Sequence, residues 1–224
     1  MRRAVLLDLD GTLVDSTQAH AQAWMRAFHR HRYDVPAERI CRWIGMGGNK
    51  LLHEVDPALS DDRDPGKSIS RLRREIFLNE YVGSLCATNG ARELLERLGA
   101  EGLLRVIASS AESDELEALL RVAKIEDLVD ITTGAADAEH SKPDPDIIEA
   151  ALRKARARPD QAVYVGDTPY DVVAAHRAGV VAIALTCAAW NAQELSDADA
   201  TYRDPADLAE HLAESPLRRS SDLD

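Results

Sequence analysis

Aspartates that follow short apolar runs are the first candidates for chemistry in this sequence. Asp8 and Asp10 come after the apolar residues 4–7, and Asp167 comes shortly after the apolar residues 162–165, with Asp171 four positions further on. Carboxylates that converge without compensation repel one another strongly in a low dielectric. A hard divalent cation that prefers oxygen ligands, Mg²⁺ above all, would remove that repulsion. The aspartates therefore predict a bound Mg²⁺ ion.

Hydroxyl and ammonium donors add a second kind of site. Ser109 and Ser110 follow the apolar run 103–108, and Lys142 precedes a helical pattern that begins at residue 146. The Ser109 hydroxyl and the Lys142 ammonium group suit an anion such as phosphate. Backbone N–H groups after Asp8 and around Ser110 could complete the cradle. A metal, an anion pocket and a carboxylate nucleophile together favour phosphoryl transfer through an aspartyl phosphate.

Alternating elements position these groups. Apolar runs predict buried strands at residues 4–7, 103–108, 129–132, 162–165 and 180–185. Helical patterns lie between or after them, at residues 90–98, 113–122, 146–156, 170–177 and 204–212. This alternation predicts an α/β fold, a Rossmann-like doubly wound parallel sheet with helices on both faces. In such a sheet ligands bind at the carboxyl ends of the strands, where the polar residues stand.

One long segment interrupts the alternation. Residues 16–86 contain no convincing strand, whereas His20, Trp24 and Phe28 recur at helical spacing and residues 69–85 predict a second helix. We therefore predict an all-helical cap at residues 16–86, inserted into a catalytic core of residues 1–15 and 87–213. Residues 214–224 are predicted to form a loose C-terminal tail.

Composition narrows the classes of function. The 224 residues are 45% apolar, which argues against disorder, and 39 acidic residues outnumber 27 basic ones to give a net charge of −12. That charge argues against a nucleic-acid partner held by phosphate neutralisation. The apolar runs are far shorter than the roughly 18 residues of a membrane span, and the three cysteines form no CxxC pair. We expect a cytoplasmic monomer with no nucleic-acid and no membrane partner.

Four segments, in order, resemble the motifs of the haloacid dehalogenase superfamily. They are residues 8–16 (DLDGTLVDS), Ser109, residues 142–146 (KPDPD) and residues 166–171 (GDTPYD). The resemblance is strongest to the phosphatases that carry a helical cap between the first and second motifs, and it extends over about residues 3–212. It implies that Asp8 is the nucleophile and that Asp10 protonates the leaving alcohol and then activates water.

The same resemblance implies the surrounding ligands. Ser109 and Lys142 would hold the transferring phosphoryl oxygens. Mg²⁺ would be bound by Asp8, by the main-chain oxygen of Asp10 and by Asp167. Asp171 would act as a further ligand or as a residue that orients the others.

Substrate contacts are predicted from the first motif and the cap. Gly11 and Ser110 are expected at the phosphate. His20, Gly48 and Lys50 are candidates for the leaving group, although His20 also fits a packing role and residues 45–50 also fit a plain turn between helices. The expected partner is a small phosphorylated metabolite of the phosphoglycolate or sugar phosphate class.

Two other functions share much of this pattern. A sugar-phosphate mutase of the β-phosphoglucomutase type would carry a His and a Trp at positions similar to His20 and Trp24. A non-catalytic phospho-acceptor that resembles a response-regulator receiver would also gather aspartates, a hydroxyl group and a lysine around Mg²⁺. Such receivers are much shorter than this chain and have no inserted cap. Thr12 and residues 166–168 (GDT) resemble phosphatases more than mutases, which often carry an acidic pair in the last motif, so hydrolysis is the favoured function.

Overall fold

A parallel sheet organises the core of the protein. The computed structural model describes residues 2–218, and within them six strands pair in the order β3-β2-β1-β4-β5-β6. All neighbours run parallel, which confirms the predicted Rossmann-like doubly wound sheet. The strands are β1 (Ala4–Leu7), β2 (Leu104–Ala108), β3 (Ile131–Thr133), β4 (Ala162–Gly166), β5 (Val181–Leu185) and β6 (Ala200–Tyr202).

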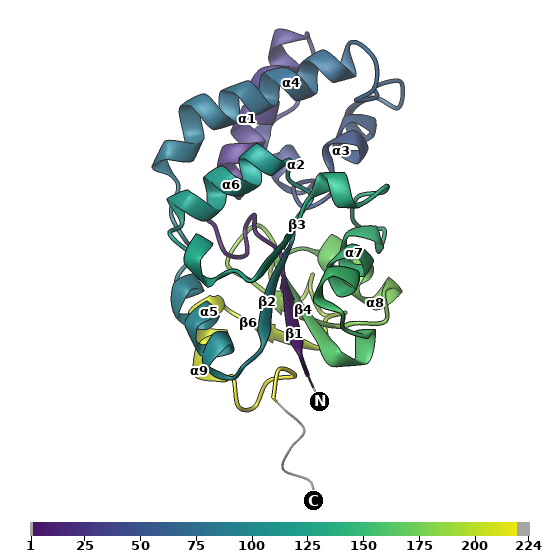
Figure 1. Ribbon diagram of the computed structural model, residues 1–224. Helices are drawn as coiled ribbons and strands as arrows, with labels where there is room; N and C mark the ends of the chain where they lie inside the picture. The colour runs from purple at the N-terminus through teal and green to yellow at the C-terminus, as the bar shows by residue number, and fades with distance from the viewer. Residues whose placement is uncertain (1, 219–224) are drawn as a thin grey trace, which may run out of the picture.

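Helices cover both faces of the sheet (Figure 1). On one face Val5 and Leu7 of β1 pack with the apolar sides of α5 (Ala91–Ala100), α6 (Ser113–Val122) and α9 (Pro205–Glu210). On the other face Ala4 and Leu6 pack with α7 (Asp146–Ala155) and α8 (Pro169–Arg177). Successive side chains of a strand point to opposite faces, so a strand buried on both sides must be apolar throughout. This is why the sequences of β1 (AVLL) and β4 (AVYVG) show no polar alternation.

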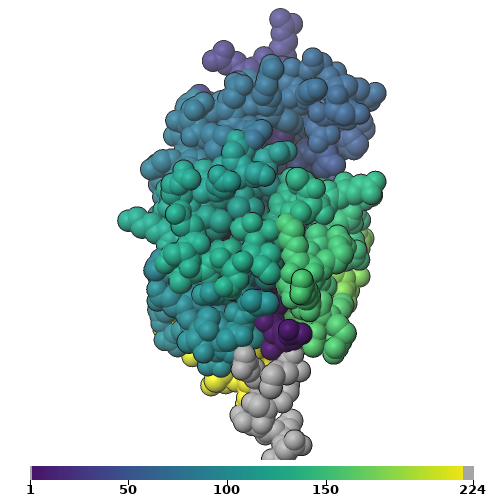
Figure 2. Space-filling view, viewed as in Figure 1, coloured from purple at the N-terminus to yellow at the C-terminus, as the bar shows by residue number. Residues whose placement is uncertain are grey.

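A helical cap stands over the carboxyl ends of the strands (Figures 1 and 2). It contains α1 (Thr17–Arg30), α2 (Ala37–Cys41), α3 (Gly48–Val55) and α4 (Gly66–Ile76). The last helix continues as a π-helical turn, η1 (Phe77–Tyr81), and a 3₁₀ turn, η2 (Val82–Ser84). Trp24, Phe28 and Leu52 belong to a core of its own. The inserted helical cap is thus confirmed, whereas the exact limits 16–86 stay a prediction.

Several short elements were not predicted from the sequence. The strand β6 has only three residues, and none of them is fully buried. Its sequence therefore contains no apolar run that could have predicted a strand. The helices α2 and α3 lie in the polar middle of the cap, where residues 45–50 gave no helical pattern. The 3₁₀ turns η3 (Glu126–Leu128), η4 (Ala135–Asp137) and η5 (Pro159–Gln161) connect elements of the core. No helix of residues 2–218 is long and apolar enough to cross a membrane.

The prediction of a loose tail from residue 214 is wrong for its first part. Ser215 and Leu217 are buried, and Leu217 joins the core cluster that contains α5 and α9. The Arg2 side chain donates a hydrogen bond to the main-chain oxygen of Pro216. The buried Leu217 side chain and the hydrogen bond from Arg2 attach this segment to the core, although its composition is polar. The remainder of the predicted tail, residues 219–224, lies outside the described residues.

Gly90 provides a test of how α5 is attached to α9. Its φ is +77°, and an added Cβ would lie 2.4 Å from the Cα of Ala206. We expect Gly90→Ala to lower the free energy of unfolding by at least the ~1–3 kcal/mol of a strained backbone, because α9 would also have to move. Urea denaturation measures the change. Gly83→Ala is the control, since a Cβ at Gly83 meets nothing within 4 Å. Equal stabilities of the two variants would contradict the expectation.

Candidate active site

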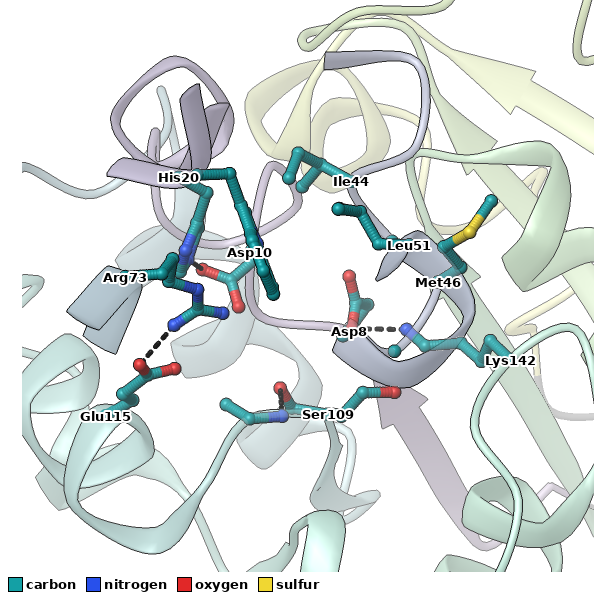
Figure 3. Close-up of a pocket in the computed structure, with 16 residues that line it drawn as sticks. Asp8, Asp10, His20, Ile44, Met46, Leu51, Arg73, Ser109, Glu115 and Lys142 are labelled. Carbon is teal, nitrogen blue, oxygen red and sulfur yellow. Dashed lines mark hydrogen bonds and ion pairs between the residues drawn. The ribbon is translucent and has the colours of Figure 1, made fainter. Parts of the chain in front are cut away.

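The predicted polar residues meet where the strand order reverses. β1 lies between β2 and β4, and Leu7 is in register with Val165 of β4 and Ile107 of β2. Asp8, Asp167 and Ser109 therefore leave the sheet at the same edge. Asp8 and Ser109 face a cavity of about 60 Å³ between core and cap (Figure 3). The lining includes Asp8, Asp10, Ser109, Ser110, Glu115 and Lys142 from the core, and His20, Trp24, Met46, Gly47, Gly48, Leu51 and Arg73 from the cap.

Lys142 is the buried cation of this site. Its side chain is 1% exposed, and Nζ donates to Oδ1 of Asp8 at 2.6 Å and to Oδ1 of Asp171 at 2.7 Å. A third donor interaction reaches the hydroxyl oxygen of Tyr164 at 3.2 Å. Burial alone would lower the pKa of Lys142, but the charges of Asp171 and Asp8 outweigh it and raise the pKa well above its ordinary value. Lys142 is therefore a permanent positive charge beside Asp8.

Asp171 holds Lys142 in place. Its Oδ1 accepts from Lys142 and, at 2.8 Å, from the Tyr164 hydroxyl. Its Oδ2 accepts from the main-chain N–H of Thr168 at 3.0 Å and from the Thr168 hydroxyl at 2.7 Å. These bonds form a capping box at the start of α8. With both oxygens engaged by protein donors, Asp171 is better suited to orient Lys142 than to bind a metal directly.

Three buried carboxylates form the acidic part of the site. Asp8, Asp167 and Asp171 each offer an oxygen within 4.8 Å of the others. Burial, opposed in part by Lys142, raises the pKa of Asp8 to about 7. Burial and the charges of Asp171 and Asp8 raise the pKa of Asp167 well above its ordinary value. One ammonium group does not neutralise three carboxylates, so the donor set fits an added divalent cation.

Gly11 allows the loop after β1 to approach this cluster. Its φ is +79°, and a Cβ there would lie 2.5 Å from Oδ2 of Asp167. The next residue, Thr12, donates from its hydroxyl to Oδ1 of Asp167 at 2.8 Å. The Gly11 position therefore requires glycine, both for the left-handed backbone and for the close approach.

Asp10 is separated from the three-carboxylate cluster by its partners. Its Oδ1 accepts from the Ser16 hydroxyl at 2.5 Å and lies 2.7 Å from Nε2 of His20. His20 comes from α1 and stacks on Phe77, with ring centroids 3.8 Å apart. Burial acts to raise the pKa of Asp10, but the charge and hydrogen bond of His20 and the bond from Ser16 outweigh it and set the pKa at about 2. The structure thus gives His20 a packing contact and a polar contact at once.

Of the remaining predicted site residues, some line the cavity and one does not. Ser109 is buried, and its Oγ accepts from the N–H of Ala111 at 3.1 Å. Ser110 and Gly48 both line the cavity. Lys50 is not among the lining residues, because its Nζ donates to Oδ2 of Asp144 at 2.6 Å and to the Ser141 main-chain oxygen. The prediction of Lys50 as a ligand of the substrate therefore does not fit the structure: its charge is engaged in a contact between cap and core.

Four residues of the site were not identified from the sequence. Thr12 stood in a motif but carried no predicted role, and Tyr164 belonged to an apolar run that indicated only a buried strand. Arg73 and Glu115 lie on predicted helices whose charged residues all fitted a solvated face. In the structure Arg73 of α4 forms an ion pair with Glu115 of α6 across the cavity (Figure 3). Long-range pairs of this kind leave no spacing pattern in the sequence.

Comparisons with known proteins agree with the four motifs. The chain is 28% identical over 207 residues to validoxylamine A 7'-phosphate phosphatase of Streptomyces hygroscopicus subsp. limoneus, with 91% of this chain and 94% of that protein covered. It is 29% identical over 232 residues to phosphoglycolate phosphatase of Escherichia coli K12, with coverages of 92% and 90%. The crystal structure of a hydrolase from Pseudomonas syringae matches with a TM-score of 0.88 and 31% identity, over 95% of this chain and 99% of that one.

A family model provides the assignment. The model described as haloacid dehalogenase-like hydrolase matches residues 5–185, a span that begins in β1 and ends with β5 and so includes all four motifs. The matched span, the doubly wound sheet and the inserted helical cap agree with one another: this chain belongs to the haloacid dehalogenase-like hydrolases.

Proposed function

We propose that the protein is a Mg²⁺-dependent phosphatase that hydrolyses a small phosphate monoester through an aspartyl phosphate. The observation that carries this proposal is the pairing of a buried carboxylate, Asp8, with the permanent charge of Lys142 at 2.6 Å, beside a cavity. A second carboxylate, Asp10, lines the same cavity. Two relatives, a phosphoglycolate phosphatase and a validoxylamine A 7'-phosphate phosphatase, support a phosphate monoester as substrate.

In the first step an oxygen of Asp8 forms a bond to phosphorus while the bond from phosphorus to the ester oxygen breaks. Asp10 donates a proton to the departing oxygen, which leaves as an alcohol. The pKa of about 2 applies to Asp10 among its protein neighbours, with no substrate in the cavity. A phosphate dianion that arrives in the cavity places negative charge next to Asp10 and so favours its protonated form. Lys142 and Ser109 donate to the phosphoryl oxygens.

In the second step Asp10, now a carboxylate, takes a proton from water as the water attacks phosphorus. The bond between phosphorus and Asp8 breaks, which releases inorganic phosphate and restores the Asp8 carboxylate. The cap covers the cavity during these steps and keeps bulk water out. Ion pairs between cap and core hold it there, among them Arg73 with Glu115, Arg74 with Asp114, Lys50 with Asp144 and Arg42 with Glu194.

Mg²⁺ fits the excess of buried negative charge. Asp8, Asp167 and the main-chain oxygen of Asp10 would hold the ion, with Asp171 behind them. When bound, it would neutralise charge that develops on the phosphoryl group and hold Asp8 in its charged form.

Asp8→Asn tests the nucleophile. We expect phosphate release to fall by at least about 10³-fold, because an amide neither attacks phosphorus nor pairs with Lys142 as a carboxylate does. Release of inorganic phosphate from a panel of monoesters, with and without Mg²⁺, measures the loss. Asp160→Asn is the control, since Asp160 is exposed and pairs with Arg158. Near-normal turnover in Asp8→Asn would refute the mechanism. Isomerisation of a hexose 1-phosphate with little phosphate release would instead indicate the mutase.

Asp10→Asn tests the acid and base. With a strongly activated ester, whose alcohol needs no proton to leave, we expect the first step to proceed and the second to stall. Mass spectrometry of the quenched protein should then detect phosphate bound to Asp8 at a level above that of the wild type. The Asp8→Asn/Asp10→Asn double variant should carry none. Unchanged steady-state hydrolysis in Asp10→Asn would remove the proposed role.

Asp167→Asn tests the metal site without an activity assay. We expect Mg²⁺ to raise the melting temperature of the wild type, since a ligand at 100 times its dissociation constant adds ~2.7 kcal/mol to stability. Asp167→Asn should lose most of this increase, because a ligand with full negative charge is removed. Asp10→Asn should retain it, since the proposed contact of Asp10 with the ion is through its main-chain oxygen. An equal increase in both variants would contradict the proposed ligand set.

A further inference from the structure

A second, larger cavity adjoins the first between cap and core. Its volume is about 540 Å³, against about 60 Å³ for the inner cavity that contains Asp8. Residues of both domains belong to both cavities, among them Trp24, Gly48, Ser110, Arg73 and Glu115. The ion pair of Arg73 with Glu115 thus stands at the junction, as the close-up shows for its inner side (Figure 3).

The two cavities differ in volume and therefore suit different parts of the substrate. The inner cavity has space for only a few waters and so suits little more than a phosphoryl group. The outer cavity lies within the range of about 300–1,000 Å³ typical of pockets for small molecules. A leaving group of two carbons would leave most of it unoccupied. The leaving group that fills it must be considerably larger.

The charged residues that line the outer cavity balance one another. Four basic residues (Lys67, Arg71, Arg73, Arg74) face four acidic ones (Asp61, Glu112, Glu115, Glu139). Balanced charge gives no net attraction for an anion. Three lining residues also have a buried polar atom without a hydrogen-bond partner in the described part of the chain: Oγ of Ser70, Nε of Arg74 and Oγ of Ser110. Each of these atoms is a polar group left unsatisfied next to the cavity.

The ion pair at the junction of the two cavities adds a preference for the kind of leaving group. Glu115 is 2% exposed, and its partner Arg73 lies over the ring of Trp24 at 5.1 Å. Because Glu115 already neutralises Arg73, the pair offers no net positive charge to a carboxylate on the leaving group. A hydroxyl group can instead donate to Glu115 and accept from Arg73. The pair therefore favours hydroxyl groups over carboxylates.

We propose that the substrate is the phosphate ester of a neutral polyhydroxylated compound of at least sugar size, and that Arg73 and Glu115 are the residues that determine this specificity. The inference rests on the proposed phosphatase function. Within the expected substrates it favours the sugar phosphate class over phosphoglycolate, whose leaving group is small and carries a carboxylate.

Two esters that differ in one group test the charge preference. Sorbitol 6-phosphate and 6-phosphogluconate share their carbon chain and differ in a terminal CH₂OH group or carboxylate. We expect kcat/KM of the wild type to be at least about tenfold higher for sorbitol 6-phosphate, since like charges brought together at a buried site are strongly unfavourable. Hydroxyethyl phosphate tests size, because its leaving group is uncharged but has only two carbons. It should also be a poorer substrate than sorbitol 6-phosphate.

Glu115→Gln then tests the assigned residue. Loss of its charge should reduce the ratio of kcat/KM between the two six-carbon esters several-fold, mainly through faster hydrolysis of 6-phosphogluconate. Glu117→Gln is the control, because Glu117 lies exposed on the same helix and should leave the ratio unchanged. The ratio in the wild type is informative even where the Glu115 variant folds poorly.

The outcomes separate the two proposals. Hydrolysis of 6-phosphogluconate or phosphoglycolate at least as efficient as that of sorbitol 6-phosphate would overturn the inference and leave the phosphatase in place. An equal ratio in wild type and Glu115→Gln would overturn the role of Glu115. Failure to hydrolyse any ester, with Mg²⁺ present, would overturn the proposed function itself.

Discussion

The candidate active site depends on the ion pairs of one buried ammonium group. Lys142 lies between Asp8, at the end of β1, and Asp171, in the first turn of α8. Neither carboxylate can stay charged in the interior without a cation, and the cation needs both of them. The ends of β1 and β4, the start of α8 and the segment before α7 must therefore come together at one point. The Tyr164 hydroxyl, which donates to Asp171, ties that point to the middle of the sheet.

The same charges explain why the site is prepared for further ligands. Lys142 neutralises only part of the charge of Asp8, Asp167 and Asp171, and burial, together with the charges of neighbouring aspartates, raises the pKa values of Asp8 and Asp167. A divalent cation reduces that excess, and a phosphate group brings new negative charge that Lys142 and the cation can share. Asp10 has other partners, His20 and Ser16, which lower its pKa. Two aspartates two residues apart thereby acquire different chemistry.

The proposed specificity depends on a different part of the molecule. In the proposed mechanism Asp8, Lys142 and Asp167 of the core act on the phosphoryl group, whereas many residues of the cap line the outer cavity proposed for the leaving group. Ion pairs between cap and core, with Arg73 and Glu115 among them, set the shape of both cavities. Such pairs connect two bodies that each have a hydrophobic core. Substitutions in the cap can therefore change the leaving group while the chemistry at phosphorus is conserved.

The order of the longer strands and helices along the chain, the presence of an inserted helical cap and most of the residues that gather at Asp8 could be predicted from the sequence. Buried parallel strands require continuous apolar runs, and ligands bind at their carboxyl ends, so local pattern and general topology suffice. Only the tertiary structure decided that Lys50 pairs with Asp144, that Asp171 holds Lys142, that Leu217 is buried and that Arg73 meets Glu115. Each of these depends on which side chains of distant segments come within a few ångströms, and no periodicity along the chain records that distance.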